Sequence, residues 1–209
     1  MKKQINQISL IICIIIVSIN YVAANDWSVK IQGERDNDRP YVMIGLSGNK
    51  SHSISSPPEP LGFKCFIMLV SLIDNNQFLN RDIRKNGNEL YEWILSVNNH
   101  GEGPPVNQTC QLSWELDKLG PGMFTLSDYS GNILINDMKK ITTYSVTSNK
   151  NKYIYYRITY NEVSISHVIS NLKTLSGITS DYSIDTNMNG VIEMKDTIRI
   201  LNYLAEIYQ

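Results

Sequence analysis

The stretch Trp27-Ser28-Val29-Lys30-Ile31 alternates large apolar residues with polar ones, and this alternation decides the fold class of the chain. A strand points successive side chains to opposite faces, so a period of two predicts a β-strand with one buried face. The pattern returns at 93–97, 112–114 and 153–160, with turn-forming segments between the repeats. Many short strands at regular spacing predict a mainly β fold, an antiparallel β-sandwich domain over residues 25–160.

A change of period marks a second region, residues 161–209. Apolar residues now recur three and four positions apart, as on one face of a helix. The two stripes consist of Ile165, Val168, Ile169, Leu172 and Leu175, and of Ile198, Leu201 and Leu204, with Ile200 and Ile207 beside the second. Helices of this kind are predicted to pack stripe against stripe, which makes the tail a small two-helix domain.

The N-terminus has the features of a secretory signal peptide. Lys2 and Lys3 precede an apolar run at 8–19, and Val22-Ala23-Ala24 supplies the small residues that a signal peptidase requires. Residues 1–24 are therefore predicted to be removed, which leaves a secreted, extracellular or periplasmic chain without a membrane span. The alternative is an uncleaved membrane anchor, for which the run is shorter than the roughly 20 apolar residues of a bilayer span.

Two cysteines, Cys65 and Cys110, belong to the predicted mature chain. In an oxidising compartment an even number favours a disulfide between them. The alternative is a pair of buried free thiols, which pack as small apolar side chains. Spacing along the chain does not choose between the two, because it does not show whether the sulfur atoms meet.

The loop from Asp185 to Asp196 carries oxygen donors at the spacing of a calcium site. Calcium takes six to eight oxygens, and a short loop gathers them only where the chain turns sharply, which Gly190 permits. The predicted ligands are Asp185, Asn187, Asn189, the Val191 carbonyl, Glu193 and Asp196, with Ile192 holding the loop against its neighbour. Because few of these donors are anionic, calcium is expected to bind with a Kd of roughly 10⁻⁵ to 10⁻³ M. The alternative is a metal-free turn whose Asp and Asn side chains cap the next helix.

The pattern Asp185-x-Asn187-x-Asn189-Gly190-x-Ile192-x-x-x-Asp196, followed by an Ile/Leu helix, resembles one half of a type I dockerin, an EF-hand-like unit. The resemblance implies protein–protein interaction with a cohesin-like or other extracellular protein, and a place in polysaccharide-degrading assemblies. The sequence departs from the family at Met194 and Lys195, where cohesin-contacting dockerins have small hydroxyl residues. The region 25–160 is similar in layout to Ig-like sandwich modules of secreted bacterial proteins.

A dockerin has two such halves, and the tail shows a trace of the first. A shift of 29 residues (198 − 169) places Ile198 on Ile169 and Leu201 on Leu172. The same shift places Asp185 on Tyr156, so the first half lacks oxygen ligands. One calcium ion is therefore expected, rather than two.

No nucleophile, zinc or phosphate-loop motif occurs in the sequence, and the three histidines, His52, His100 and His167, belong to none. The formal net charge of −1, without a Lys/Arg cluster, excludes the electrostatic footprint of nucleic-acid binding. The expectation is a non-enzymatic protein. One alternative is an unrecognised glycoside hydrolase, which needs two carboxylates across one cleft. The scattered candidates are Asp74, Asp82, Glu89, Glu92, Glu115 and Asp128.

The tryptophans Trp27, Trp93 and Trp114 raise a further alternative, a carbohydrate-binding or adhesion module that stacks exposed rings on sugars. Each lies in an alternating strand with apolar neighbours two positions away. Such neighbours share the face of the ring, so the pattern favours a place in the core.

Overall fold

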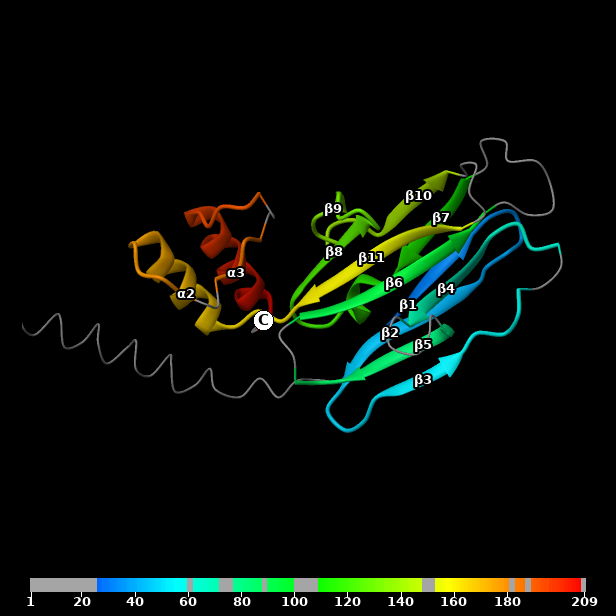
Figure 1. Cartoon of the computed structure of the whole chain (residues 1–209), viewed down its shortest axis with the longest axis horizontal. Helices are drawn as coiled ribbons and strands as arrows, with labels where there is room; N and C mark the ends of the chain where they lie inside the picture. Colours follow the sequence, from blue (N-terminus) through cyan, green and yellow to red (C-terminus); the bar gives the residue numbers. More distant parts are fainter. Residues whose placement is uncertain are drawn as a thin grey trace, which may run out of the picture.

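The computed structural model describes residues 26–59, 62–71, 77–87, 90–99, 109–147, 153–180, 183–186 and 189–207 (Figure 1). A β-domain precedes a helical tail. The strands are β1 Trp27–Glu34, β2 Tyr41–Ser47, β3 His52–Ser55, β4 Phe66–Ser71, β5 Gln77–Lys85, β6 Leu90–Asn98, β7 Thr109–Trp114, β8 Met123–Asp128, β9 Ile133–Ile135, β10 Thr143–Thr147 and β11 Ile154–Asn161. The helices are the 3₁₀ turn η1 Leu116–Lys118, α2 Ile165–Leu175 and α3 Met194–Ile207.

The period-two alternation places side chains as expected. In β1, Val29 and Ile31 are buried while Ser28 is exposed. In β11, Tyr156, Ile158 and Tyr160 are the buried side chains. The buried residues of both strands belong to one hydrophobic core of the β-domain. The mainly β class is therefore confirmed.

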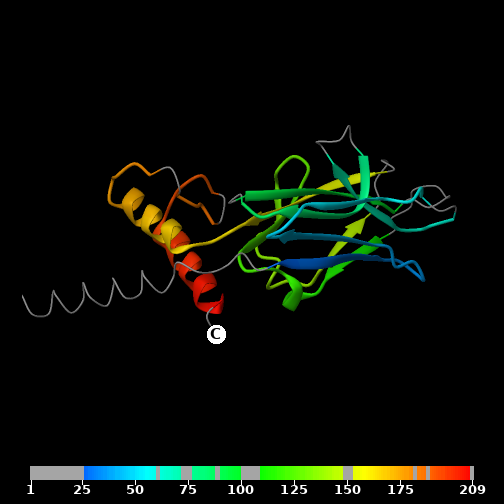
Figure 2. The same ribbon diagram turned by 90° about the horizontal axis from the view of Figure 1, so that it is seen from below.

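The strands of the described chain form one hydrogen-bonded sheet rather than two separate ones. Its order is β10-β7-β1-β2-β5-β4-β6-β11-β8-β9, with β3 on the other edge of β5. Figure 2 shows this sheet curled, so that the blue strands β1 and β2 form a layer beneath the green β6 and the yellow β11. The parallel pairing of β2 with β5, at Ile44 and Asp82, joins the two halves of this strand order into one sheet. The observed architecture is a curled half-barrel, and the finer Ig-like prediction is not confirmed.

An aromatic cluster fills the core at one end of the half-barrel. The ring of Trp27 lies edge-on to Trp93 and Phe124, with centroids 6.0 and 5.1 Å away, and 5.2 Å from Tyr160. Trp93 is 1% exposed, and Trp114 is buried with its Nε1–H donated to the Met138 carbonyl at 2.9 Å. These rings pack on apolar neighbours, so they offer no exposed row for stacking on sugars.

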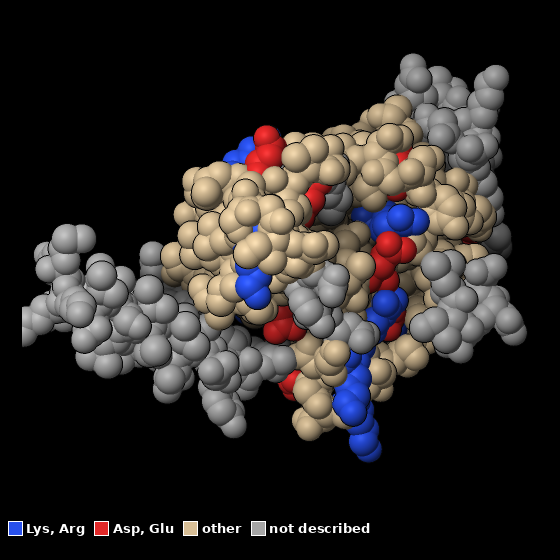
Figure 3. All heavy atoms as spheres, turned by 60° about the vertical axis from the view of Figure 1, so that its left-hand side comes forward, with Lys and Arg blue, Asp and Glu red and all other residues tan. Residues whose placement is uncertain are grey.

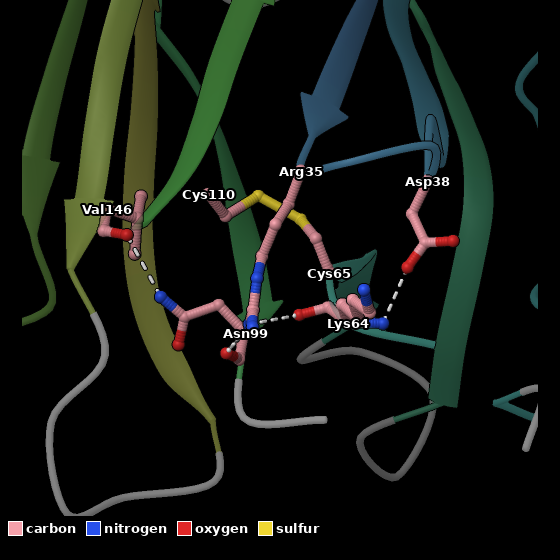
Figure 4. Close-up of a disulfide and its surroundings, with 7 residues drawn as sticks. All are labelled: Arg35, Asp38, Lys64, Cys65, Asn99, Cys110 and Val146. Atoms are coloured by element: carbon pink, nitrogen blue, oxygen red, sulfur yellow. Dashed lines mark hydrogen bonds between the residues drawn. A yellow bond between two sulfur atoms is a disulfide. The ribbon is translucent and has the colours of Figure 1, made fainter. Parts of the chain in front are cut away.

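The structure joins Cys65 and Cys110 by a disulfide that is fully buried at the other end of the core (Figure 4). The bond connects the chain just before β4 to β7, two segments that are not neighbours in the sheet. Gly33 lies against it, since a Cβ at this position would be 2.9 Å from the Cys65 sulfur. The Arg35 side chain passes beside the bond and donates from Nη1 to the Lys64 and Asn99 carbonyls, at 2.8 and 2.6 Å.

The helical tail lies at the end of the β-domain where β11 leaves the sheet (Figure 1). Helix α2 begins after Ser164, whose N–H donates to His167 Nδ1 at 3.0 Å, and the chain leaves it through Gly177 at a φ of 83°. The two helices share a small core with β8, built from Met123, Val163, Val168, Ile200, Tyr203 and Leu204. No helix in the described ranges is long and apolar enough to cross a membrane.

The prediction that the two apolar stripes pack fully against each other is wrong. Val168 and Leu204 are buried as expected, but Leu172 and Ile198 are 44% and 51% exposed. Each helix turns a face containing His167 and Asn171, or Asp196 and Thr197, towards the protein interior. Because His167, Asn171 and Asp196 have hydrogen-bond partners there, part of each apolar stripe is turned outwards.

Candidate metal centre

The candidate loop connects α2 to α3 and is held by hydrogen bonds at both ends. Asp185, Thr186 and residues 189–196 are described, whereas the predicted ligand Asn187 lies outside the described residues. The other predicted ligands, Asp185, Asn189, Val191, Glu193 and Asp196, are all among the described residues.

The first half of the loop closes on Asp185. Gly190 has a φ of 83°, a left-handed conformation that glycine adopts without strain. Its N–H donates to Asp185 Oδ2 at 2.6 Å, and the N–H of Val191 donates to Asn189 Oδ1 at 2.9 Å. Positions 1, 5 and 6 of the predicted loop are thereby brought together, as the sequence analysis requires.

The second half closes on Asp196, which is fully buried in the first turn of α3. Its Oδ1 accepts from the N–H and the hydroxyl of Thr186, at 3.1 and 2.7 Å, and its Oδ2 accepts from the N–H of Glu193 at 2.7 Å. A carboxylate at this place satisfies N–H groups that have no partner within the helix. Asp196 therefore ties the start of the loop to the start of the helix.

Glu193 lies at the surface of the loop. Its Oε2 accepts from Lys195 Nζ at 2.6 Å and from Asn189 Nδ2 at 2.9 Å. The hydrogen bond from Lys195 lowers the pKa of the Glu193 carboxyl below its usual value. Ile192 is half-buried and the Val191 side chain is exposed. Because that side chain is a hydrocarbon, the carbonyl is the group that Val191 can offer a metal.

The donor set of this loop suits a hard cation, because it contains carboxylate, amide and carbonyl oxygens and no sulfur or imidazole. Within the described ranges, no three Asp, Glu, His or Cys side chains gather as a metal-binding group. Asp185, Asn189 and Asp196 are hydrogen-bonded to backbone N–H groups, which also matches the metal-free cap. Both predictions share this chain path, and they differ in whether the loop depends on calcium.

Arg199, which the sequence analysis missed, connects the loop to the β-domain. Its Nη1 donates to the Thr186 carbonyl at 3.0 Å, and its Nη2 donates to the Asn136 carbonyl at 2.7 Å and lies 3.8 Å from the buried Asp137 carboxylate. The available signal was its position three residues after Asp196, on the same side of α3. The loop and the region after β9 are thus held by one guanidinium group.

An exposed apolar face covers the outer side of the tail. It consists of Ile169, Leu172, Leu175, Ile178, Val191, Met194, Ile198 and Leu201. Ile169 and Leu172 occupy the positions that the 29-residue shift (198 − 169) relates to Ile198 and Leu201. Figure 3 brings this end of the molecule forward, and its surface is largely free of charged side chains. A large number of exposed apolar side chains in one small domain is uncommon on monomers, and exposed apolar patches mark interaction sites.

The histidines form no catalytic arrangement in the described chain. His52 is exposed on β3, and His167 is buried at the start of α2, where it accepts the Ser164 N–H. His100 lies outside the described residues.

Comparison with known proteins found no matching family model, no matching curated protein and no matching solved structure. The dockerin and Ig-like resemblances therefore rest on the residues quoted for them.

Proposed function

We propose that this chain is a secreted, non-enzymatic binding protein whose helical tail is ordered by one calcium ion and presents an apolar face to another extracellular protein. The observation that carries the proposal is the loop closed on Asp185 and Asp196 beside that face. Calcium would be held by Asp185, Asn187, Asn189, the Val191 carbonyl, Glu193 and Asp196, and would supply structural charge rather than chemistry. The dockerin resemblance suggests a cohesin-like partner.

Two features support calcium over a purely hydrogen-bonded cap. The loop turns at Gly190, whose N–H donates to Asp185, and of the two nearby cations Lys195 pairs with Glu193 and Arg199 with the Thr186 carbonyl. Metal binding to such a loop is coupled to folding, because the ligands are separated in the unfolded chain. A calcium concentration a hundred times Kd would stabilise the tail by about 2.7 kcal/mol.

Calorimetric titration of chelator-treated protein tests the metal. We expect one ion per chain with a Kd of roughly 10⁻⁵ to 10⁻³ M, and a loss of affinity of at least about tenfold in Asp185→Asn. The matched control is Asp128→Asn, because Asp128 also holds a turn, accepting from the Asn132 N–H at 2.9 Å, but lies in the β-domain. The calcium site is rejected if the native chain releases or absorbs no heat at millimolar calcium, or if Asp185→Asn and Asp128→Asn bind calcium equally well.

Surface binding to a recombinant cohesin domain tests the apolar face. We expect binding in calcium that is lost with chelator and in the double variant Ile198→Asp/Leu201→Asp. Tyr41→Asp is the control, since Tyr41 is an exposed large side chain of the β-domain. If the cohesin does not bind the native chain, or binds the double variant equally well, a cohesin-like partner is rejected.

A further inference from the structure

A pocket of 610 Å³ opens on the β-domain between β5 and β6, two strands that do not pair with each other in the described chain. Strand β5 pairs with β4 only up to Leu79, and from there its partners are β3 and β2. Strand β4 pairs with β6 at 94–98, so the 90–93 part of β6 has β11 as its partner on one side only. The pocket occupies the resulting gap, and its volume is typical of small-molecule sites.

Side chains bridge the gap where backbone pairing stops. Trp93 donates from Nε1 to the Asp82 carbonyl at 3.2 Å, and the Tyr91 hydroxyl donates to the Lys85 carbonyl at 3.1 Å. The Arg84 guanidinium lies over the Trp93 ring, with 5.2 Å between its central carbon and the ring centroid. These contacts fix β5 relative to β6, so the pocket is preformed rather than dependent on a bound molecule.

The charged groups that line the pocket balance each other. Asp82 and Arg84 form an ion pair at 3.0 Å and are mostly shielded from solvent, while Glu92 pairs with Arg157 at 3.1 Å. With Lys85, the lining holds two carboxylates and two cations. A site without net charge gives no advantage to a phosphate or to a metal ion. It favours a neutral ligand that both donates and accepts hydrogen bonds.

Hydrogen-bonding capacity remains on these side chains. The Asp82 contact involves Arg84 Nε, and within the described chain the terminal nitrogens of Arg84 donate to no acceptor. Ser53 and His52 also line the pocket, and Leu90 adds an exposed apolar side chain. Guanidinium donors, carboxylate acceptors and hydroxyl groups beside an apolar wall complement a sugar ring, which has hydroxyl edges and C–H faces.

We infer that this pocket binds a sugar, as a mono- or short oligosaccharide, through Asp82, Arg84 and Glu92. This site is independent of the tail and of the function proposed for it. It differs from the tryptophan-stacking alternative, because recognition here comes from hydrogen bonds inside a pocket. Although Asp82 and Glu92 line one cavity, each carboxylate faces an arginine, whose charge opposes the raised pKa that a glycosidase acid needs. The site therefore binds its ligand without hydrolysing it.

Saturation-transfer NMR and calorimetry with glucose, galactose, mannose, xylose, N-acetylglucosamine and cellobiose test the inference on the full mature chain. We expect at least one of these sugars to bind, and its affinity to fall about 10- to 100-fold in Asp82→Asn and in Glu92→Gln, because each change removes a charged hydrogen-bonding partner. The Trp93 bond survives Asp82→Asn, since it uses the backbone carbonyl. Glu34→Gln is the matched control, because Glu34 forms an exposed ion pair with Arg39 away from the pocket.

Four outcomes overturn the inference. They are no binding by any of these sugars at tens of millimolar, binding by both pocket variants as tight as that of the native chain, displacement of the sugar by inorganic phosphate, and release of reducing ends that Glu92→Gln abolishes. The third identifies an anion site, and the fourth identifies a hydrolase. Thermal unfolding of each variant shows whether it is folded. Should Asp82→Asn unfold, Glu92→Gln on the neighbouring strand decides the question.

Discussion

Removal of the Cys65–Cys110 bond should destabilise the β-domain by about 4 kcal/mol. The cysteines are 45 residues apart. A cross-link over a loop of this length lowers the chain entropy of the unfolded state by an amount worth about 4 kcal/mol at 25 °C. Since a small domain has a total stability of roughly 5–15 kcal/mol, reduction should leave the chain folded but marginal.

Urea unfolding followed by tryptophan fluorescence measures this difference, because Trp93 and Trp114 are buried. With a slope of about 2 kcal/mol per molar urea, the midpoint should fall by about 2 M between the oxidised and the reduced chain. The chain should begin at residue 25, so that Cys13 does not take part. Alkylation and mass spectrometry establish the redox state of each sample.

Gly33→Ala supplies a second arm of the same experiment. Its Cβ would lie 2.9 Å from the Cys65 sulfur and 3.3 Å from the Cys110 sulfur. Overpacking of this kind costs about 1–3 kcal/mol, and the loss should shrink when the bond is reduced and the sulfurs can separate. A midpoint that is unchanged by reduction, with Gly33→Ala equally harmful in both states, would refute the assignment of stability to this bond.

Three further changes have defined outcomes. Gly120→Ala places a Cβ 2.5 Å from the Trp27 ring and should cost about 1–3 kcal/mol in urea unfolding, whereas Gly48→Ala, with its nearest neighbour at 3.5 Å, should be nearly neutral. Arg199→Gln should speed hydrogen exchange in the tail and leave exchange in β1 to β7 unchanged, because it releases the candidate loop from the β-domain; unchanged exchange in the tail contradicts the link. Burial raises the pKa of Tyr160 well above its usual value, so its contribution to stability is complete below about pH 10 and is lost as the pH rises and the unfolded chain ionises. An unfolding midpoint that stays constant from pH 8 to about pH 11 speaks against that burial.

Local patterns predicted the elements of this protein well. Strand periodicity identified the buried faces of β1, β6 and β11, and the change to a helical period located α2 and α3. Gly190 was expected to turn the loop, and it adopts a positive φ. These predictions succeed because the geometry of a strand, a helix or a tight turn is set by neighbours in the chain.

The candidate loop was predicted only in part. Its turn was expected from the spacing around Gly190, and the structure joins Gly190 to Asp185 and Thr186 to Asp196. The hydrogen bonds from Thr186 to Asp196 and the contact with Arg199 were not foreseen. Both depend on how the helix is rotated against the β-domain, which no local spacing encodes.

What the sequence determined by itself was the order of strands and helices, the side of each that is apolar, and the residue types in the loop and in the disulfide. The tertiary structure alone decided that the strands join into one curled sheet, that β5 and β6 lie on either side of a pocket, and that part of each helical stripe faces outwards. Periodicity fixes which side chains share a face. What that face meets depends on pairings and packing between segments far apart in the chain.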